Sequence, residues 1–260
     1  MFRNLGQWLT SGEAPPTLPV KSSRAFTLLE LLAAMGVIAV LAVLTLAAAG
    51  KLRSTLQGAH CTNNLRQLGA ATALYLNDNE RRYFDYSRNV PEGRLWYFGL
   101  EKKGGGSREG DRDLDRTKSP LYPYLQSVGG VEVCLAFPYE QAIWKPKFKG
   151  GSWGYGYNTS LSGVNMAALE RPSRVIVFGD CAQVNTFQPP ASPSKPMVEE
   201  FYMIESRFKT IHFRHGASAN LLFADGHVQA MQVFPGTEDD RLPEANVGRV
   251  TAVGSVDLLR

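Results

Sequence analysis

Three histidines and one aspartate near the C-terminus are the residues best suited to metal binding or hydrolysis. His212, His215, Asp225 and His227 lie close together in the chain. Imidazole and carboxylate groups bind metals and move protons. One hypothesis is therefore a membrane-anchored periplasmic enzyme or binding protein that uses His212, His215 and Asp225. Because no His-Glu-x-x-His or Cys-x-x-Cys spacing is present, we expect no metal ligand, no cofactor and no catalytic residue.

The local sequence offers a structural explanation for the same residues. Nine residues separate His215 from Asp225-Gly226, and an Asp-Gly pair favours a type I′ hairpin turn, which needs positive φ at both positions. We expect strands near 219–224 and 227–233, with Phe223 opposite Val228 and Leu221 opposite Ala230. His215 is then expected to hydrogen-bond a loop backbone or Asp225, stabilising the entry of the first strand.

Three cysteines, Cys61, Cys134 and Cys181, complete the set of reactive side chains. Outside the cytoplasm one disulfide among them could persist, and the odd count leaves one thiol over. Spacing alone does not say which two would pair.

An apolar segment near the N-terminus contains a single acid, Glu30. The 19 residues from Leu31 to Ala49 are uncharged, enough for a helix that crosses about 30 Å of hydrocarbon. An acid at the bilayer centre costs about 2.5–3.5 kcal/mol, so a plain signal anchor does not explain Glu30. An ordinary secretory signal, cleaved after Ala47-Ala48-Ala49, is the other alternative.

Residues 21–76 and 210–232 resemble type IV prepilins and type II secretion pseudopilins. The order Arg24-Ala-Phe-Thr-Leu-Leu-Glu30 is similar to their cleavage signal, although Ala25 replaces the commoner Gly. The resemblance implies cleavage between Ala25 and Phe26, and N-methylation of Phe26. It also implies that Glu30 pairs with the N-terminal amine of a neighbouring subunit. Residues 215–226 resemble the H-x9-DG segment found with this signal.

Some members of that family bind calcium through loop oxygens. Here the candidate oxygen donors have no recognisable calcium-loop spacing; they are Asp180, Asp225, Asp239 and Asp240. Where the family often has Cys-Pro, this chain has Cys134-Leu135.

The resemblance implies an α+β, pilin-like fold, with a long N-terminal transmembrane helix packed on an antiparallel β-sheet domain. Its parts would be a cytoplasmic leader (1–25), a transmembrane half-helix (26–50), an amphipathic half-helix (51–79) and an extracytoplasmic domain (80–260). The sequence itself also predicts the long helix, because apolar positions from Leu52 to Leu76 recur with a period near 3.6 residues and no proline interrupts residues 26–76. Asn77-Asp78-Asn79 is the expected end.

The implied function is assembly rather than catalysis. The chain would be a single-pass protein of the bacterial inner membrane, with its N-terminus cytoplasmic. It would become a subunit of a type II secretion pseudopilus or a type IV pilus-like filament, in the periplasm or at the surface. The implied partners are the prepilin peptidase/methyltransferase, other pseudopilin subunits, the inner-membrane assembly platform and the lipid bilayer. A net charge of +4 is too small and dispersed to indicate nucleic acid.

The remaining patterns predict elements of the globular domain. Val131–Phe137 and Arg174–Phe178 are candidate strands, and Leu121–Leu125 is a short helix or turn. Residues 101–118 hold 11 charged residues and three consecutive glycines, which predicts a solvated, mobile loop. The aromatic residues of Trp153–Tyr157 are expected to fill the core.

Overall fold

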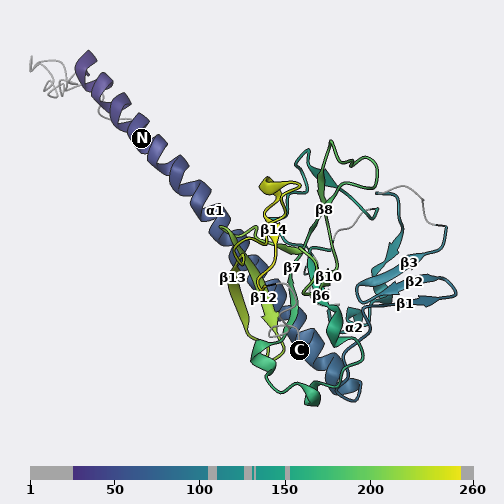
Figure 1. The fold of residues 1–260 in the computed structure, drawn as a ribbon. Helices are drawn as coiled ribbons and strands as arrows, with labels where there is room; N and C mark the ends of the chain where they lie inside the picture. The colour runs from purple at the N-terminus through teal and green to yellow at the C-terminus, as the bar shows by residue number, and fades with distance from the viewer. Residues whose placement is uncertain (1–25, 105–109, 126–130, 132, 150–152, 253–260) are drawn as a thin grey trace, which may run out of the picture. The chain divides into compact units, whose positions relative to one another are not determined.

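The computed structural model describes residues 26–104, 110–125, 131, 133–149 and 153–252. The chain divides into two compact units, residues 1–48 and 49–260. Helix α1, Leu28–Asp78, contributes to both (Figure 1). The predicted helix and its end at the Asn-Asp-Asn sequence are therefore confirmed.

In the first unit, the N-terminal part of α1 is strongly apolar. Leu28–Leu46 is the one helical stretch among the described residues that is long and apolar enough to cross a membrane, by length and composition. The side chains described in this stretch are all exposed within the chain. An unpartnered apolar helix surface of this length favours lipid as its surroundings.

The second unit is built on a five-stranded sheet with the order β10-β6-β7-β12-β13. The strands are β6 (Tyr155–Asn158), β7 (Ile176–Asp180), β10 (Met203–Ile204), β12 (Ser218–Phe223) and β13 (Val228–Gln232). Every pairing is antiparallel except that of the edge strand β10 with β6. The unit is thus α+β, as predicted. Residues 153–157 do fill the core, as expected.

Smaller sheets and short helices surround this sheet. β1–β4 form an antiparallel meander, β5, β9 and β8 form a second sheet, and β11 pairs with β14. Their bounds are β1 Ser87–Val90, β2 Gly93–Trp96, β3 Gly99–Lys102, β4 Leu114–Asp115, β5 Trp144–Lys145, β8 Gln183–Asn185, β9 Met197–Glu199, β11 Ile211–His212 and β14 Val247–Gly248. The helices are α2 Tyr122–Leu125, η1 Arg116–Lys118, η2 Thr159–Leu161, η3 Met166–Ala168, η4 Pro172–Arg174 and η5 Pro243–Ala245.

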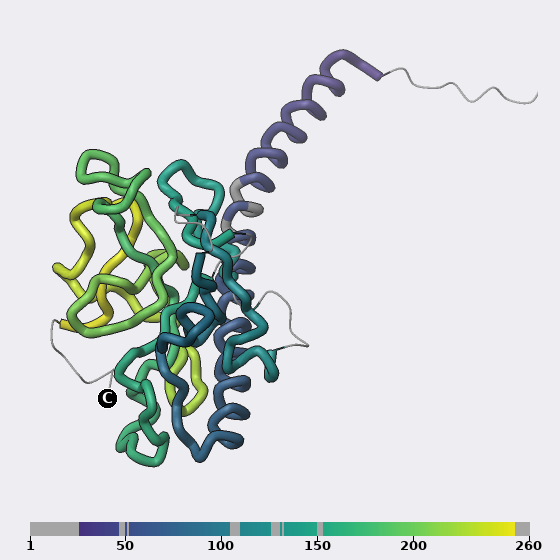
Figure 2. Tube along the Cα trace, turned by 90° about the vertical axis from the view of Figure 1, so that its right-hand side faces the viewer, coloured from purple at the N-terminus to yellow at the C-terminus, as the bar shows by residue number. Residues whose placement is uncertain are grey.

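The C-terminal part of α1 packs on the five-stranded sheet (Figure 2). Its buried face recurs every three or four residues, as an amphipathic helix requires, and includes Cys61, Leu65, Leu68, Thr72 and Leu76, with Ala71 beside Thr72. At Gly69 a Cβ atom would lie 3.0 Å from Leu222 Cδ1. Glycine at this position therefore lets the helix approach β12 closely.

The hairpin β12–β13 forms where predicted, but its register and turn differ. Leu222 pairs with Val228, and Leu221 with Gln229, one residue away from the predicted partners. Only Gly226 in the turn has positive φ, at 90°, and its N–H bonds Phe223 O at 2.9 Å. This is a three-residue loop with glycine at the left-handed position, not a two-residue type I′ turn.

Two other predictions are wrong. Val131–Phe137 is not a strand in its described residues, because Asn64 of α1 donates to Val133 O and Phe137 N–H bonds Cys134 O. Residues 101–118 are not wholly loop, since β3 and β4 pair across them. Glu101 of β3 accepts hydrogen bonds from Trp96 of β2 and from Arg112, just before β4. The predicted strand near 174–178 is confirmed as β7, and Leu121–Leu125 as α2.

Candidate functional site

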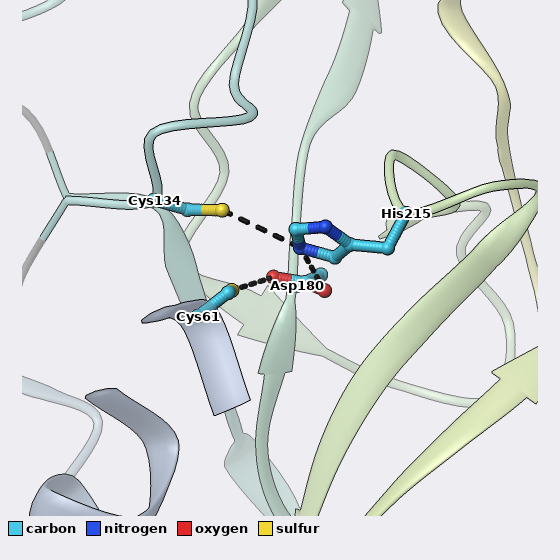
Figure 3. Close-up of side chains that lie close together, drawn as sticks. All are labelled: Cys61, Cys134, Asp180 and His215. Atoms are coloured by element: carbon cyan, nitrogen blue, oxygen red, sulfur yellow. Dashed lines mark hydrogen bonds and ion pairs between the residues drawn. The ribbon is translucent and has the colours of Figure 1, made fainter. Parts of the chain in front are cut away.

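Four potential ligands converge in the second unit, from four separate segments (Figure 3). Cys61 comes from α1, Cys134 from the loop before β5, Asp180 from the end of β7, and His215 from the turn before β12. The Cys61 thiol donates to Asp180 Oδ1 at 3.1 Å. His215 Nε2 lies 3.3 Å from Asp180 Oδ2 and 3.5 Å from Cys134 Sγ. We call these four residues the Cys-Cys-Asp-His cluster.

A tight turn positions His215. Gly216 and Ala217 have φ values of 61° and 64°. His215 and Ser218 exchange both backbone hydrogen bonds across them, at 2.9 and 3.2 Å. Positive φ at both central residues is what a type I′ turn requires. The turn type predicted for Asp225-Gly226 therefore occurs nine residues earlier, at the other end of β12.

Arg214 neutralises the buried Asp180 carboxylate. Its Nη2 donates to Asp180 Oδ1 and to Gly154 O, both at 2.6 Å. The backbone N–H of Asn220 donates to Asp180 Oδ2 at 2.7 Å. Burial alone would raise the pKa of Asp180, but Arg214, His215 and this N–H together hold it well below its usual range. Asp180 is therefore an anion in the folded chain.

The two thiols of the cluster differ in their electrostatics. The neighbouring Cys61 thiol lowers the pKa of Cys134 to about 4, with help from Arg214 and His215 and against the effect of burial. Burial raises the pKa of Cys61 well above its usual value. Burial lowers the pKa of His215, but bonds to Asp180 and Cys134 outweigh it and raise that pKa to about 9. The charges favour a Cys134 thiolate beside a His215 imidazolium.

The cluster is closed to solvent. The side chains of Cys61, Cys134 and Asp180 are fully buried, and that of His215 is 8% exposed. The hydroxyl of Tyr155 lies 3.1 Å from Cys61 Sγ. His215 Nδ1 has no hydrogen-bond partner among the described residues. A buried site of this kind stabilises a fold or holds an ion more readily than it admits a substrate.

The sequence-predicted grouping of His212, His215 and Asp225 does not form. The His212 ring packs edge-on against Phe137, and its Nδ1 lies 3.1 Å from Arg214 Nη1. Asp225 pairs with His227 at 2.6 Å on the surface. His215 and Asp225 lie at opposite ends of β12, which at about 3.3 Å per residue spans about 20 Å. The expected bond between His215 and Asp225 is therefore wrong.

A cavity of about 360 Å³ lies beside Asp225 and Gly226. Its other lining residues come mainly from α1 and β12, among them Thr72, Leu76 and Leu222. Neither His212 nor His215 lines it. The arrangement that would favour the enzyme hypothesis, a concave pocket surrounded by His212, His215 and Asp225, is not found among the described residues.

Sequence patterns do not predict the Cys-Cys-Asp-His cluster. Its members are separated by dozens of residues, so no local spacing joins them. The sequence offers Asp180 only as a candidate oxygen donor for calcium, and it offers His215 either as a structural residue or in a group with His212 and Asp225, never with the two cysteines. The one hint in the sequence of such a site is its composition: the chain contains cysteines, histidines and aspartates that could all bind a metal.

The N-terminal motif has its own local geometry. The Thr27 hydroxyl accepts from Glu30 N–H at 3.2 Å, and Glu30 Oε2 accepts from Thr27 N–H at 2.9 Å. These reciprocal bonds form a capping box, which stabilises the first turn of α1. Phe26 immediately precedes it and is 85% exposed. Ala25 and the predicted leader lie outside the described residues.

Comparison with known proteins supports the same segment. A family model described as the prokaryotic N-terminal methylation motif matches residues 20–46. No curated protein and no solved structure matches the chain. The matched residues include Ala25, Phe26 and Glu30, and they end where the apolar stretch Leu28–Leu46 ends. The chain therefore carries the N-terminal methylation motif of prepilin-like proteins, at the head of an apolar helix.

Proposed function

We propose that the chain is a membrane-anchored prepilin-like subunit that is processed and then assembled into a filament. The match to the methylation motif over residues 20–46 is the observation that carries this proposal. Cleavage falls between Ala25 and Phe26, and the prepilin peptidase/methyltransferase methylates the new amine of Phe26. The chain crosses the inner membrane once, with its leader (1–25) in the cytoplasm and its globular domain outside.

The assembled form is a type II secretion pseudopilus or a type IV pilus-like filament. The apolar part of α1 supports this proposal, because its exposed face can exchange lipid for the helices of other subunits. The inner-membrane platform and other pseudopilin subunits are the partners. The chain acts as a structural subunit without catalysis of its own, and His215, Asp225 and Gly226 serve folding.

Glu30 carries the assembly step in this proposal, by pairing with the N-terminal amine of a neighbouring subunit. A carboxylate near lipid needs a cationic or hydrogen-bonding partner. In the isolated chain, Thr27 supplies hydrogen bonds to Glu30 Oε2 from both its N–H and its hydroxyl. Removing the side chain would therefore abolish both a helix cap and a charge.

Two substitutions separate these roles. Glutamine also serves in a capping box but has no charge, so Glu30→Gln keeps the cap while Glu30→Ala loses it. We expect both variants to insert and to lose the leader, and both to lose filament assembly. Leader removal is measured by gel mobility, and assembly by the amount of subunit in sheared filaments.

The outcomes differ clearly. Normal filament yield from Glu30→Ala would refute any assembly role for Glu30. Assembly restored by Glu30→Gln but not by Glu30→Ala would show that Glu30 acts through the capping box rather than through charge.

A further inference from the structure

The donor atoms of the Cys-Cys-Asp-His cluster are arranged like the corners of a metal site. The two sulfurs, one imidazole nitrogen and one carboxylate oxygen all lie within 4.8 Å of one another. They come from a helix, a loop, a strand end and a turn that no local sequence pattern connects. Figure 3 shows the side chains directed toward a common point.

The distances between donors fit tetrahedral coordination. With Zn–S at about 2.3 Å and Zn–N and Zn–O at about 2.0 Å, a tetrahedron separates S from N by about 3.5 Å, and N from O by about 3.3 Å. Cys134 Sγ lies 3.5 Å from His215 Nε2, and His215 Nε2 lies 3.3 Å from Asp180 Oδ2. Cys61 Sγ is 3.1 Å from the other carboxylate oxygen, Asp180 Oδ1, and within 4.8 Å of the remaining donors.

The Asn220 N–H already donates to Asp180 Oδ2 at 2.7 Å, but the imidazole ring of His215 cannot bond both of its neighbours in the cluster. His215 Nε2 carries at most one proton, yet it faces both Cys134 Sγ and Asp180 Oδ2. One N–H cannot point directly at two acceptors. A metal ion placed among the donors would contact Cys134 Sγ, Asp180 Oδ2 and His215 Nε2 at once.

The charges around the cluster also suit a divalent cation. Metal binding would deprotonate Cys61 as well as Cys134, so the two thiolates and the Asp180 carboxylate would carry three negative charges. A divalent ion and the Arg214 guanidinium, 2.6 Å from Asp180 Oδ1, carry three positive charges. The buried site would then be neutral, with Arg214 and the Tyr155 hydroxyl orienting Asp180 and Cys61 from outside the coordination sphere.

We propose that Cys61, Cys134, Asp180 and His215 bind one Zn²⁺ ion. Two thiolates, an imidazole and a carboxylate in a tetrahedron select zinc over calcium or magnesium, which require oxygen donors. All four positions come from the protein and the site is buried, so the ion is structural rather than catalytic. It joins α1 to the sheet. The prediction of no metal ligand rests on local spacing, which cannot detect ligands brought together from distant segments.

The test uses the full chain in detergent, kept reduced, incubated with zinc and freed of excess metal by gel filtration. We expect one zinc per chain in the unsubstituted protein, measured by elemental mass spectrometry. Cys134→Ser and His215→Ala should reduce bound zinc to background. Cys181→Ser is the matched control, because Cys181 is equally buried but lies outside the cluster, and it should retain the metal.

His215→Cys keeps the test decisive if His215→Ala fails to fold. It offers a third thiolate, so it should still bind one zinc. With Co²⁺ as the probe, its sulfur-to-metal charge-transfer absorption should exceed that of the unsubstituted chain. An identical cobalt spectrum would remove His215 from the ligand set and overturn the proposal.

Absence of zinc from the folded, unsubstituted chain would also overturn it. The proposal would be overturned whether Cys61 and Cys134 are then found as free thiols or as a disulfide. The intact mass distinguishes these two forms, because a disulfide has two hydrogens fewer. Zinc lost from Cys181→Ser and kept in Cys134→Ser would equally overturn it. The proposal is independent of filament assembly, since zinc content and assembly are measured separately.

Discussion

Glu199 is a fully buried acid outside the Cys-Cys-Asp-His cluster, and it pairs with two lysines. Its carboxylate lies 2.5 Å from Lys145 Nζ and 3.0 Å from Lys147 Nζ, and it also accepts from Gln183. Burial raises the pKa of Glu199, but the two lysines and Gln183 outweigh it, so that pKa lies below its ordinary value of 4.5. Buried charges of this kind are stabilising only while both signs are present.

Substitution of Glu199 should therefore make stability less sensitive to acid. Because the pKa of Glu199 is lower in the folded chain, the unfolded chain binds the proton more readily than the folded chain does in acid. The contribution of Glu199 to the free energy of unfolding is therefore fully present well above pH 4.5. It is lost as the pH falls through the pKa of the folded state. We expect Glu199→Gln to lower the free energy of unfolding by about 3 kcal/mol at neutral pH. The measurement is denaturant unfolding at several pH values.

The quantity to compare is the difference in the free energy of unfolding between the unsubstituted chain and Glu199→Gln. It should be constant near neutral pH and shrink in acid, because protonation removes the same charge that the substitution removes. A difference that does not change with pH would show that Glu199 contributes through packing instead.

Among the elements, the β12–β13 hairpin depends most on one backbone conformation. Gly226 has φ of 90°, and a Cβ atom added there would meet no other atom within 4 Å, so any effect of substitution comes from the backbone. A β-branched residue resists positive φ. We expect Gly226→Val to lower the free energy of unfolding by about 2 kcal/mol. Gly226→Asn, which tolerates this region better, is the control, and denaturant unfolding measures both.

Equal stability of the Val and Asn variants would contradict a conformational role for Gly226. It would also imply that the loop can change its turn type without cost.

The elements that can be predicted from the sequence are those with a local physical cause. Helix α1 follows from the spacing of its apolar residues and the absence of proline, and the hairpin from Asp225-Gly226. The hairpin register is wrong by one residue, because an Asp-Gly pair fits both a two-residue loop and a longer loop with glycine last. The segment around Val133 has the composition of a strand, but its backbone bonds Asn64 of α1, a contact that local sequence does not reveal.

The candidate site shows the same limit more strongly. His215 is correctly placed before a strand, yet its partners cannot be deduced, because β7 brings Asp180 beside it only through sheet pairing with β12. Cys61 reaches the cluster only because α1 packs on that sheet. Non-local contacts such as these are decided by the tertiary fold, not by spacing in the chain.

For the whole molecule, processing gives the most direct prediction. Cleavage before Phe26 leaves 235 of the 260 residues and preserves the Thr27–Glu30 capping box. We expect mass spectrometry of membrane-extracted protein to find an N-terminal, methylated Phe26. Ala25→Arg should block the cut, because the position before the cut takes a small residue in proteins that this chain resembles. A mature terminus at Gly50 would instead establish an ordinary secretory signal.

The division of α1 between two units determines where a soluble fragment can begin. Cys61, Leu65 and Leu68 are fully buried against the sheet, so the helix belongs to the domain core well before the predicted boundary at residue 80. A fragment that starts at Glu80 would expose the apolar layer these residues cover, and would aggregate. One that starts just after Gly50 discards the apolar stretch Leu28–Leu46 and keeps every helix position that is buried among the described residues. Expression work and crystallisation should therefore place the first residue between Gly50 and Cys61.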